Sequence, residues 1–282
     1  MAILPRHRPD ALGRPTLDRV LCAVDAGRAG AHAIREALAL APCATRLSFI
    51  TVTDTAETGS DRIASLAAHR ARQTLESALA LASARALPAE TELVAAANVA
   101  DALLARAATT DLLVVGSRGE APAPGAATGS VAAALAARAT GPLLVARAGA
   151  GAQGTRPRIL VAVDDGAAAA ALVALAGAIA IACHGYVHLV HVQGRGYGSP
   201  TRRRLAELST ALIEQTGSEP VVEVARAANV AAHVCQLAQD SSSSLLVVGR
   251  PGRPGRRGLG AVAERILHGS PCSVLVGPAL AA

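Results

Sequence analysis

The stretch that decides the fold is "LLVVGSRG", Leu112 to Gly119, because it recurs as "LLVVGRPG", Leu245 to Gly252. Each copy is a continuous run of four apolar residues followed by a glycine, and a second glycine stands three residues further on. A continuous apolar run of this length is typical of a strand that is buried on both faces, as in a parallel sheet covered by helices. The repeat predicts one such strand in each of two related halves of the chain.

Two further pairs of segments recur in the same order. "RVLCAVDAG", Arg19 to Gly27, matches "RILVAVDDG", Arg158 to Gly166, and "GSVAAALAARATGPLLVAR", Gly129 to Arg147, matches "GAVAERILHGSPCSVLVG", Gly260 to Gly277. Matching segments stand roughly 130 to 140 residues apart in a chain of 282 residues, which indicates a tandem duplication. We therefore expect a flexible N-terminal tail over 1–15, a first domain over 16–147, a Gly/Ala-rich linker over 148–156 and a second domain over 157–282.

Strand-like runs alternate with helical patterns in each half, which is typical of an α/β protein with a doubly wound parallel sheet. The prediction is two tandem five-stranded sheets, each in the order 3-2-1-4-5 and flanked by helices. The first half has predicted strands near 19–25, 45–52, 91–96, 111–116 and 142–147, and predicted helices near 29–41, 60–86, 99–107 and 129–139. The predicted strands of the second half lie near 158–164, 186–192, 220–225, 244–249 and 272–276.

The composition excludes several kinds of chemistry. All 27 basic residues are arginines, so a phosphate loop of the Walker type and any Schiff-base mechanism are ruled out. The net charge of +6 permits anionic partners. Aromatic residues make up only 1% of the chain, which leaves little surface for stacking single-stranded nucleic acid, and no nucleic-acid partner is predicted.

Cysteine usage and the long apolar segments bear on location. The five cysteines are scattered and form no CxxC, which is typical of thiols in a reducing compartment and favours the cytoplasm. The N-terminal "MAILPRHRPDALGRPT" lacks the apolar core of a secretory signal. Gly166 to Cys183 runs eighteen residues without a charge, but it is mostly Ala and Gly, so we expect a helix buried between domains or subunits and no membrane span.

The glycines that follow the fourth strand point to an anion site. In a doubly wound sheet, ligands bind beyond the carboxyl ends of the strands where the strand order reverses, here between Asp25 and Gly116. Gly116 and Gly119 would let the backbone pass close to a bound group. Gly129-Ser130 would begin the next helix, where free N–H groups and the helix dipole favour an anion, and Asp25 has acceptors for ribose hydroxyls. The glycine pair alone is equally typical of ordinary turns.

These segments together resemble the universal stress proteins in their tandem two-domain form. The resemblance rests on the "AVD" ending of each first strand, on "LLVVGSRG", on the Gly-x2-Gly-x9-Gly-Ser pattern and on the ending "SPCSVLVG". It implies a doubly wound fold, frequent dimerisation, and binding of ATP or another adenine nucleotide in some members but not in others. Position by position, it implies that Asp25 contacts the ribose and Val52 the adenine, with Arg118 alongside the phosphates. The residues implied around the phosphates and ribose are Gly116, Gly119, Gly129, Ser130 and Val131.

The two halves depart from this pattern in different ways. The first spacer, "EAPAPGAAT", has two prolines and no arginine. In the second half the spacer has seven residues and the helix-start pair is Gly260-Ala261, without a hydroxyl, so a nucleotide is expected to bind there poorly or not at all. The second loop instead carries Arg250, Arg253, Arg256 and Arg257, either as a solvated loop or as an anion-binding one.

No catalytic constellation is predicted. His188 and His191 stand three apart on a probable strand and point to opposite faces, which argues against a shared metal. Asp164-Asp165 lacks a third group for acid–base work. We therefore expect no enzyme beyond slow ATP hydrolysis incidental to binding, with Mg²⁺ present only with the nucleotide. The predicted function is an ATP-dependent stress regulator or sensor with paired domains and a homodimer; the alternative is a scaffold that binds no nucleotide and acts through protein partners or dimerisation.

Overall fold

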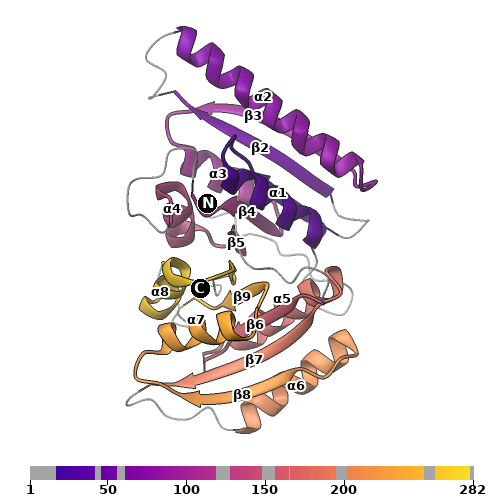
Figure 1. Cartoon of the computed structure of the whole chain (residues 1–282), viewed down its shortest axis with the longest axis vertical. Helices are drawn as coiled ribbons and strands as arrows, with labels where there is room; N and C mark the ends of the chain where they lie inside the picture. Colours follow the sequence, from indigo (N-terminus) through magenta and orange to yellow (C-terminus); the bar gives the residue numbers. More distant parts are fainter. Residues whose placement is uncertain are drawn as a thin grey trace. The chain divides into compact units, whose positions relative to one another are not determined.

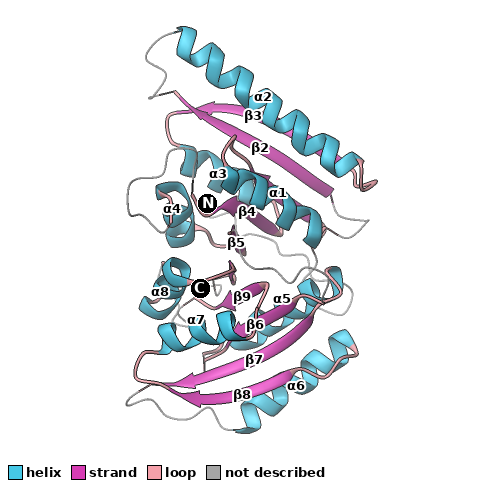
Figure 2. Cartoon of the chain, viewed as in Figure 1, coloured by secondary structure: helices cyan, strands magenta, loops and turns pink. Residues whose placement is uncertain are grey.

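The chain forms two compact units, over Leu17–Arg147 and Ala148–Ala282, in a computed structural model (Figure 1). The structure describes residues 17–41, 46–55, 61–118, 128–147, 156–164, 166–194, 202–250 and 258–279. Strands and helices alternate along each unit (Figure 2), which confirms the predicted α/β class. The predicted tail, most of the predicted linker and the two glycine-rich loops lie outside the described residues.

The first unit contains one parallel sheet in the order β3-β2-β1-β4-β5, as predicted. Its strands are β1 (Arg19–Ala23), β2 (Arg46–Asp54), β3 (Ala89–Ala96), β4 (Leu112–Gly116) and β5 (Leu143–Ala146). Its helices are α1 (Arg28–Leu40), α2 (Asp61–Ser83), α3 (Val99–Ala107) and α4 (Ser130–Arg138). Strand β2 runs two residues past its predicted end, because Asp54 is still paired with Ala96 of β3.

Helices cover both faces of this sheet. Right-handed crossovers place α1 and α2 on one face and α3 and α4 on the other, and α3 packs on α4. Every residue of β5 and the first four of β4 are buried, which is why these strands read as continuous apolar runs. The edge strand β3 is more polar. There, Glu90 accepts a hydrogen bond from Ser48 and Glu92 pairs with Arg106.

The second unit repeats this plan in the order β8-β7-β6-β9-β10, which is again 3-2-1-4-5 within the unit. Its strands are β6 (Arg158–Ala162), β7 (Tyr186–Gln193), β8 (Val221–Arg226), β9 (Leu245–Val248) and β10 (Ser273–Val276). Its helices are α5 (Ala169–Ala182), α6 (Arg202–Thr216), α7 (Val230–Asp240) and α8 (Ala261–Gly269).

The corresponding helices α3 and α7 begin with the same cap, which shows how closely the halves match. Asn98 Oδ1 accepts the Asp101 N–H at 2.9 Å, and Asn229 Oδ1 accepts the Ala232 N–H at 3.2 Å. Each bond satisfies one of the backbone donors left over at a helix start.

The apolar helix α5 has eight of its fourteen residues buried, and it packs on another helix of the second unit. That helix is α6, where Gln215 Nε2 donates to the Ala174 carbonyl at 2.9 Å. A Cβ at Gly177 would lie 2.3 Å from Gln215 Oε1, so any larger residue would require the Gln215 side chain to move. Within the described part of the chain, no helix is both long and apolar enough to cross a membrane.

Candidate functional site

Asp25 lies just beyond the carboxyl end of β1 and holds the start of α1. Its Oδ1 accepts the N–H of Gly27 at 3.0 Å and the N–H of Gly30 at 3.1 Å. A carboxylate suits this position because the first N–H groups of a helix carry partial positive charge. Asp25 was predicted to contact the ribose of a nucleotide. One of its two carboxylate oxygens, Oδ1, already has a structural role at the start of α1, which the sequence did not indicate.

Val52 lies beside this carboxylate, near the end of the neighbouring strand β2. The β1–β2 ladder continues past Ala23, with the Val24 N–H donating to the Ile50 carbonyl at 2.9 Å. The Thr51 hydroxyl then donates to the Val24 carbonyl at 3.0 Å, so the segments 24–25 and 51–52 run side by side. Val52 is partly exposed at this edge, as a surface for a flat apolar ring requires.

Gly116 ends β4 and lies directly under the start of α1. A Cβ on Gly116 would stand 2.8 Å from the Ala29 Cβ and 2.9 Å from the Ala29 backbone. The absence of a side chain at Gly116 therefore makes room for Ala29 of α1, independently of any ligand. In this way Gly116 connects the end of β4 with the Asp25 segment through the first turn of α1.

The two ends of the glycine-rich loop meet at the carboxyl edge of the sheet. The Gly129 N–H donates to the Ser117 carbonyl at 2.7 Å, and the Ser117 N–H donates to the Ala146 carbonyl at 2.9 Å. This brings Gly116 close to Gly129, the N-cap of α4, and to Ser130, which is exposed in the first turn. The neighbouring Val131 is partly buried. At the other end of the loop, Arg118 is exposed, while Gly119 lies outside the described residues.

Two polar residues that the sequence reasoning missed lie at the same place. Arg147 directly follows β5 and is half-buried, and its Nη2 donates to Thr128 Oγ1 at 3.0 Å. Thr128 is only 6% exposed and immediately precedes Gly129-Ser130. Two features of the sequence could have pointed to these residues: Arg147 directly follows a predicted strand, and Thr128 directly precedes the Gly129-Ser130 pair.

This arrangement fits an anion with an attached sugar and base better than it fits catalysis. The start of α4 offers backbone N–H groups, the Ser130 hydroxyl and a nearby guanidinium, all of which attract negative charge. The Asp25 carboxylate and the partly exposed Val52 lie on the neighbouring strands. The Asp25 carboxylate at this edge already receives two backbone N–H groups.

The matching edge of the second unit has lost most of these groups. Asp164 keeps one turn bond, from the Gly166 N–H to its Oδ1 at 2.9 Å. The residues that correspond to Thr128, Ser130 and Arg147 are Leu259, Ala261 and Pro278.

Arg250, which follows β9, does not fit the first of the two alternatives for the arginine-rich loop, that of a solvated side chain. The side chain is 6% exposed and its Nε donates to the Gly277 carbonyl at 3.1 Å; burial lowers the pKa of its guanidinium to about 10. The other three arginines of that loop, Arg253, Arg256 and Arg257, lie outside the described residues, as does the second motif glycine, Gly252.

The two histidines of β7 serve separate structural contacts. His191 Nδ1 lies 2.9 Å from the Val163 carbonyl, to which it donates, and occupies the position of Thr51 in the first unit. His188 is 6% exposed, with its Nε2 3.2 Å from Glu223 Oε2. Burial lowers the pKa of His188, the Glu223 carboxylate opposes this effect and the Arg158 charge adds to it. The described residues contain no cluster of histidine, cysteine or carboxylate side chains that could hold a metal ion.

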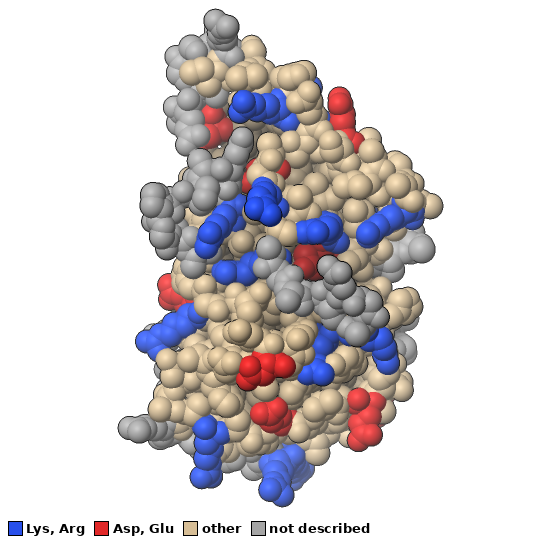
Figure 3. All heavy atoms as spheres, viewed as in Figure 1, with Lys and Arg blue, Asp and Glu red and all other residues tan. Residues whose placement is uncertain are grey.

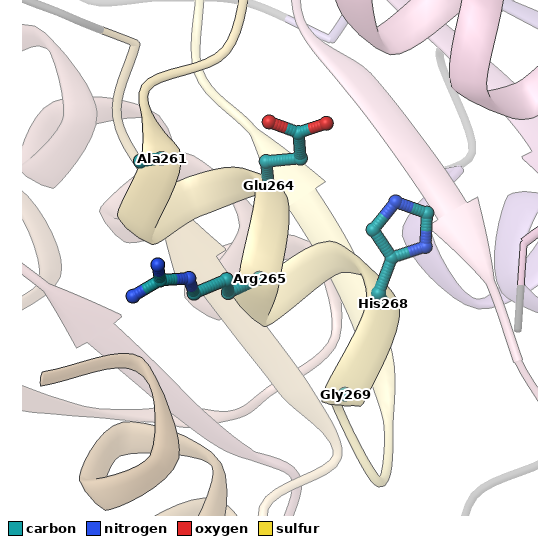
Figure 4. A pocket seen from close by; sticks show the side chains of 5 residues that line it. All are labelled: Ala261, Glu264, Arg265, His268 and Gly269. Carbon is teal, nitrogen blue, oxygen red and sulfur yellow. The ribbon is translucent and has the colours of Figure 1, made fainter. Parts of the chain in front are cut away.

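A surface depression lies along one side of α8 (Figure 4) and is lined by Ala261, Glu264, Arg265, His268 and Gly269. Glu264, Arg265 and His268 project from the helix without converging on one point. Ligand sites usually gather polar groups from several elements, so we assign no ligand to this depression. On the face drawn in Figure 3, the described arginines are interspersed with acidic side chains and form no continuous basic patch.

These features define a class of protein: a duplicated, doubly wound α/β protein with a glycine-rich loop at the carboxyl edge of each sheet. The model of the universal stress protein family matches residues 16–147 and, again, residues 155–278. The chain belongs to the universal stress protein family.

Two solved structures that match 93% of this chain share its fold. A universal stress protein from Archaeoglobus fulgidus is 17% identical, with a TM-score of 0.75 over 93% of this chain and 98% of that one. A Pseudomonas aeruginosa protein titled as a universal stress protein is also 17% identical, with a TM-score of 0.65 over 93% of both chains. Another A. fulgidus universal stress protein, solved in complex with dAMP, is 19% identical and covers 44% of this chain and 98% of its own, with a TM-score of 0.35. No curated protein matches the chain.

Proposed function

We propose that the first unit binds an adenine nucleotide, with ATP as the expected ligand, and that the protein acts as a nucleotide-dependent regulator or sensor in the stress response. The observation that carries this proposal is the 2.7 Å hydrogen bond from the Gly129 N–H to the Ser117 carbonyl. It holds the end of β4 against the start of α4, and this supports a phosphate cradle between the two ends of the loop.

Each part of the nucleotide has a matching group at this edge. The base would lie against the partly exposed Val52, and the ribose hydroxyls would donate to the Asp25 carboxylate. Phosphate oxygens would accept hydrogen bonds from the backbone and hydroxyl at the Gly129-Ser130 helix start, flanked by Gly116, Gly119, Val131 and the Arg118 side chain. Mg²⁺ would arrive with the polyphosphate, because the described residues provide no cluster of metal ligands.

Regulation would follow from the construction of the site. Because α1 starts on Asp25 and α4 starts on the loop, a bound nucleotide bridges two helices that pack on opposite faces of the sheet. A ligand that binds one arrangement of these helices more tightly shifts the population toward it. The proposal includes no catalytic step. It places the protein in the cytoplasm, where cysteine thiols remain reduced.

Nucleotide that co-purifies with the protein tests this proposal. Purified protein, denatured with acid and cleared of precipitate, should release an adenine compound that chromatography and mass spectrometry identify. Protein that arrives empty should bind added ATP reversibly. If the supernatant contains no nucleotide and the empty protein binds no ATP at millimolar concentration, the proposal fails.

A second candidate function is a scaffold that binds no nucleotide and acts through protein partners or dimerisation. The observation in its favour is the edge strand β8, where Val221, Val222 and Val224 are 52%, 44% and 49% exposed. In the first unit α2 packs on β2 and β3, whereas the described packing partner of α6 is α5. Unpaired apolar edges favour association with another strand. Sedimentation that shows a stable dimer, lost on Val222→Glu, in a protein without ATP binding would favour this alternative.

A further inference from the structure

We propose that Arg147 supplies the positive charge that binds the phosphates at the first unit's site. The inference rests on the proposed function and names a residue that neither the glycine pattern nor the family resemblance includes. The loop itself offers little charge for this purpose, because its nine-residue spacer contains no arginine.

The position of Arg147 follows from the hydrogen bonds around it. Arg147 is the first residue after β5, and β5 pairs with β4 up to Gly116 and Ala146. Its side chain extends along the carboxyl edge of the sheet to Thr128, with 3.0 Å between Nη2 and Oγ1. Thr128 directly precedes the N-cap of α4, so the guanidinium lies beside the helix start at which the phosphates are expected.

The chemistry of the side chain fits this role. A guanidinium has five N–H donors in a planar fork that matches two oxygens of a phosphate. Half-burial strengthens its attraction for an anion, because less water screens the charge. The contact with the buried Thr128 hydroxyl holds the fork in one orientation before a ligand arrives, which lowers the entropy lost on binding.

The second unit supplies an independent comparison. Thr128, Ser130 and Arg147 come from two different segments of the chain, and all three are replaced by residues without a side-chain polar group, namely Leu259, Ala261 and Pro278. The arginine of the second unit, Arg250, starts from the neighbouring strand β9 and donates to the Gly277 carbonyl. The loss of all three polar groups together is what we expect if they serve one ligand.

Arg118 is the other cation near the loop, and its placement differs. It is exposed, so solvent and salt screen its charge more strongly than that of the half-buried Arg147. We therefore assign the larger share of phosphate binding to Arg147, and we expect it to distinguish phosphorylated adenine compounds from adenosine.

The test compares ATP with adenosine by isothermal titration in the full-length protein and its variants. Arg147→Gln should lower the affinity for ATP by about tenfold or more, the size of one lost charge-assisted hydrogen bond, and leave the affinity for adenosine unchanged. Arg147→Lys should fall between the wild type and Arg147→Gln, because it keeps the charge but loses the fork. Arg138→Gln removes the same charge from the last turn of α4, where Arg138 pairs with Asp101, and should leave both affinities unchanged.

The possible outcomes separate this inference from the proposed function. If Arg147→Gln binds ATP as tightly as Arg138→Gln does, the inference is wrong and the proposed function stands. If Arg147→Gln and Arg147→Lys lose affinity for ATP and adenosine equally, together with a lower melting temperature, Arg147 has only a structural role. If the wild type binds neither compound, the proposed function fails and the inference fails with it.

Discussion

The carbonyl oxygen of Ser117 accepts the backbone N–H of Gly129 at 2.7 Å, across a loop whose intervening residues 119–127 lie outside the described structure. The bond joins the end of a buried strand to the start of a helix, and the sheet holds it in place because the Ser117 N–H donates to Ala146 of β5. The ends of the loop are therefore placed by the core of the first unit, whatever the residues between them do. This is the feature on which the proposed nucleotide site depends.

Gly116→Ala should destabilise the first unit. The added Cβ would lie 2.8 Å from the Ala29 Cβ and 2.9 Å from the Ala29 backbone, so α1 would have to move away from β4. Overpacking of this kind costs about 1–3 kcal/mol of unfolding free energy. Urea unfolding measures the change.

Gly141→Ala is the matched control for that substitution. Gly141 lies between α4 and β5, and a Cβ there would meet no described atom within 4 Å. The free energy of unfolding should stay at the wild-type value or rise slightly. Equal losses in the two variants would show that close packing against Ala29 is not what Gly116 provides.

Asp25→Ala should reduce both stability and nucleotide binding. The substitution removes the acceptor for the N–H groups of Gly27 and Gly30, at a cost of about 1–2 kcal/mol in the free energy of unfolding. It also removes the carboxylate proposed for the ribose, so the affinity for ATP should fall. Thermal melting and calorimetric titration measure the two effects.

Asp164→Ala in the second unit controls for the structural part of that effect. Asp164 makes the corresponding turn bond to Gly166, so this variant should lose stability as well, but it should bind ATP like the wild type. A fall in ATP affinity as large as that of Asp25→Ala would argue that the binding loss comes from general destabilisation.

His188 should make the second unit less stable as the pH falls below about 7. Burial lowers the pKa of His188 beneath its usual value of 6.5. Above that value the imidazole is neutral in the folded and the unfolded chain, and the stability is fully present. Between the usual and the lowered pKa the unfolded chain binds a proton more readily, so the free energy of unfolding decreases as the pH falls.

Two variants test whether protonation of His188 lowers the free energy of unfolding. His188→Gln should lose less stability than the wild type between about pH 7.5 and pH 5, because it removes the titrating group. Glu223→Gln should lose more, because the Glu223 carboxylate opposes the lowering of the His188 pKa. The midpoints of urea unfolding, measured across this pH range, test the prediction. Identical pH profiles for the wild type and the two variants would contradict a role of His188 in the pH dependence of stability.

The fold was predictable because its signals are local and occur twice. The runs Leu112–Val115 and Leu245–Val248 are each buried throughout, and such runs in alternation with helices specify a parallel sheet without any long-range information. Even the caps Asn98 and Asn229 are visible in the sequence as a repeated "AANVA".

The polar contacts at the carboxyl edges of the two sheets were less predictable, because they join residues that are far apart in the sequence. Nothing in the residues around Arg147 indicates that its side chain contacts Thr128, nineteen positions earlier, or that Arg250 reaches Gly277, twenty-seven positions later. An arginine-rich loop is typical of solvent exposure, one of the two alternatives, but Arg250 is only 6% exposed because its side chain extends to the Gly277 carbonyl after β10. Similarly, the Asp25 carboxylate was read as a ligand group, although its hydrogen bonds to Gly27 and Gly30 depend on how α1 starts.

The most direct test of the account is the number of ATP molecules bound per chain, measured by calorimetric titration of the wild type, Gly129→Val and Gly260→Val. Both glycines have extended backbones, with φ −67° and −72°, which valine also adopts, so the two substitutions are matched in backbone conformation. The account predicts one ATP per chain in the wild type and in Gly260→Val, and at least about tenfold weaker binding in Gly129→Val, where one charge-assisted contact or more is lost. No binding by the wild type, or unchanged affinity in Gly129→Val, would contradict it.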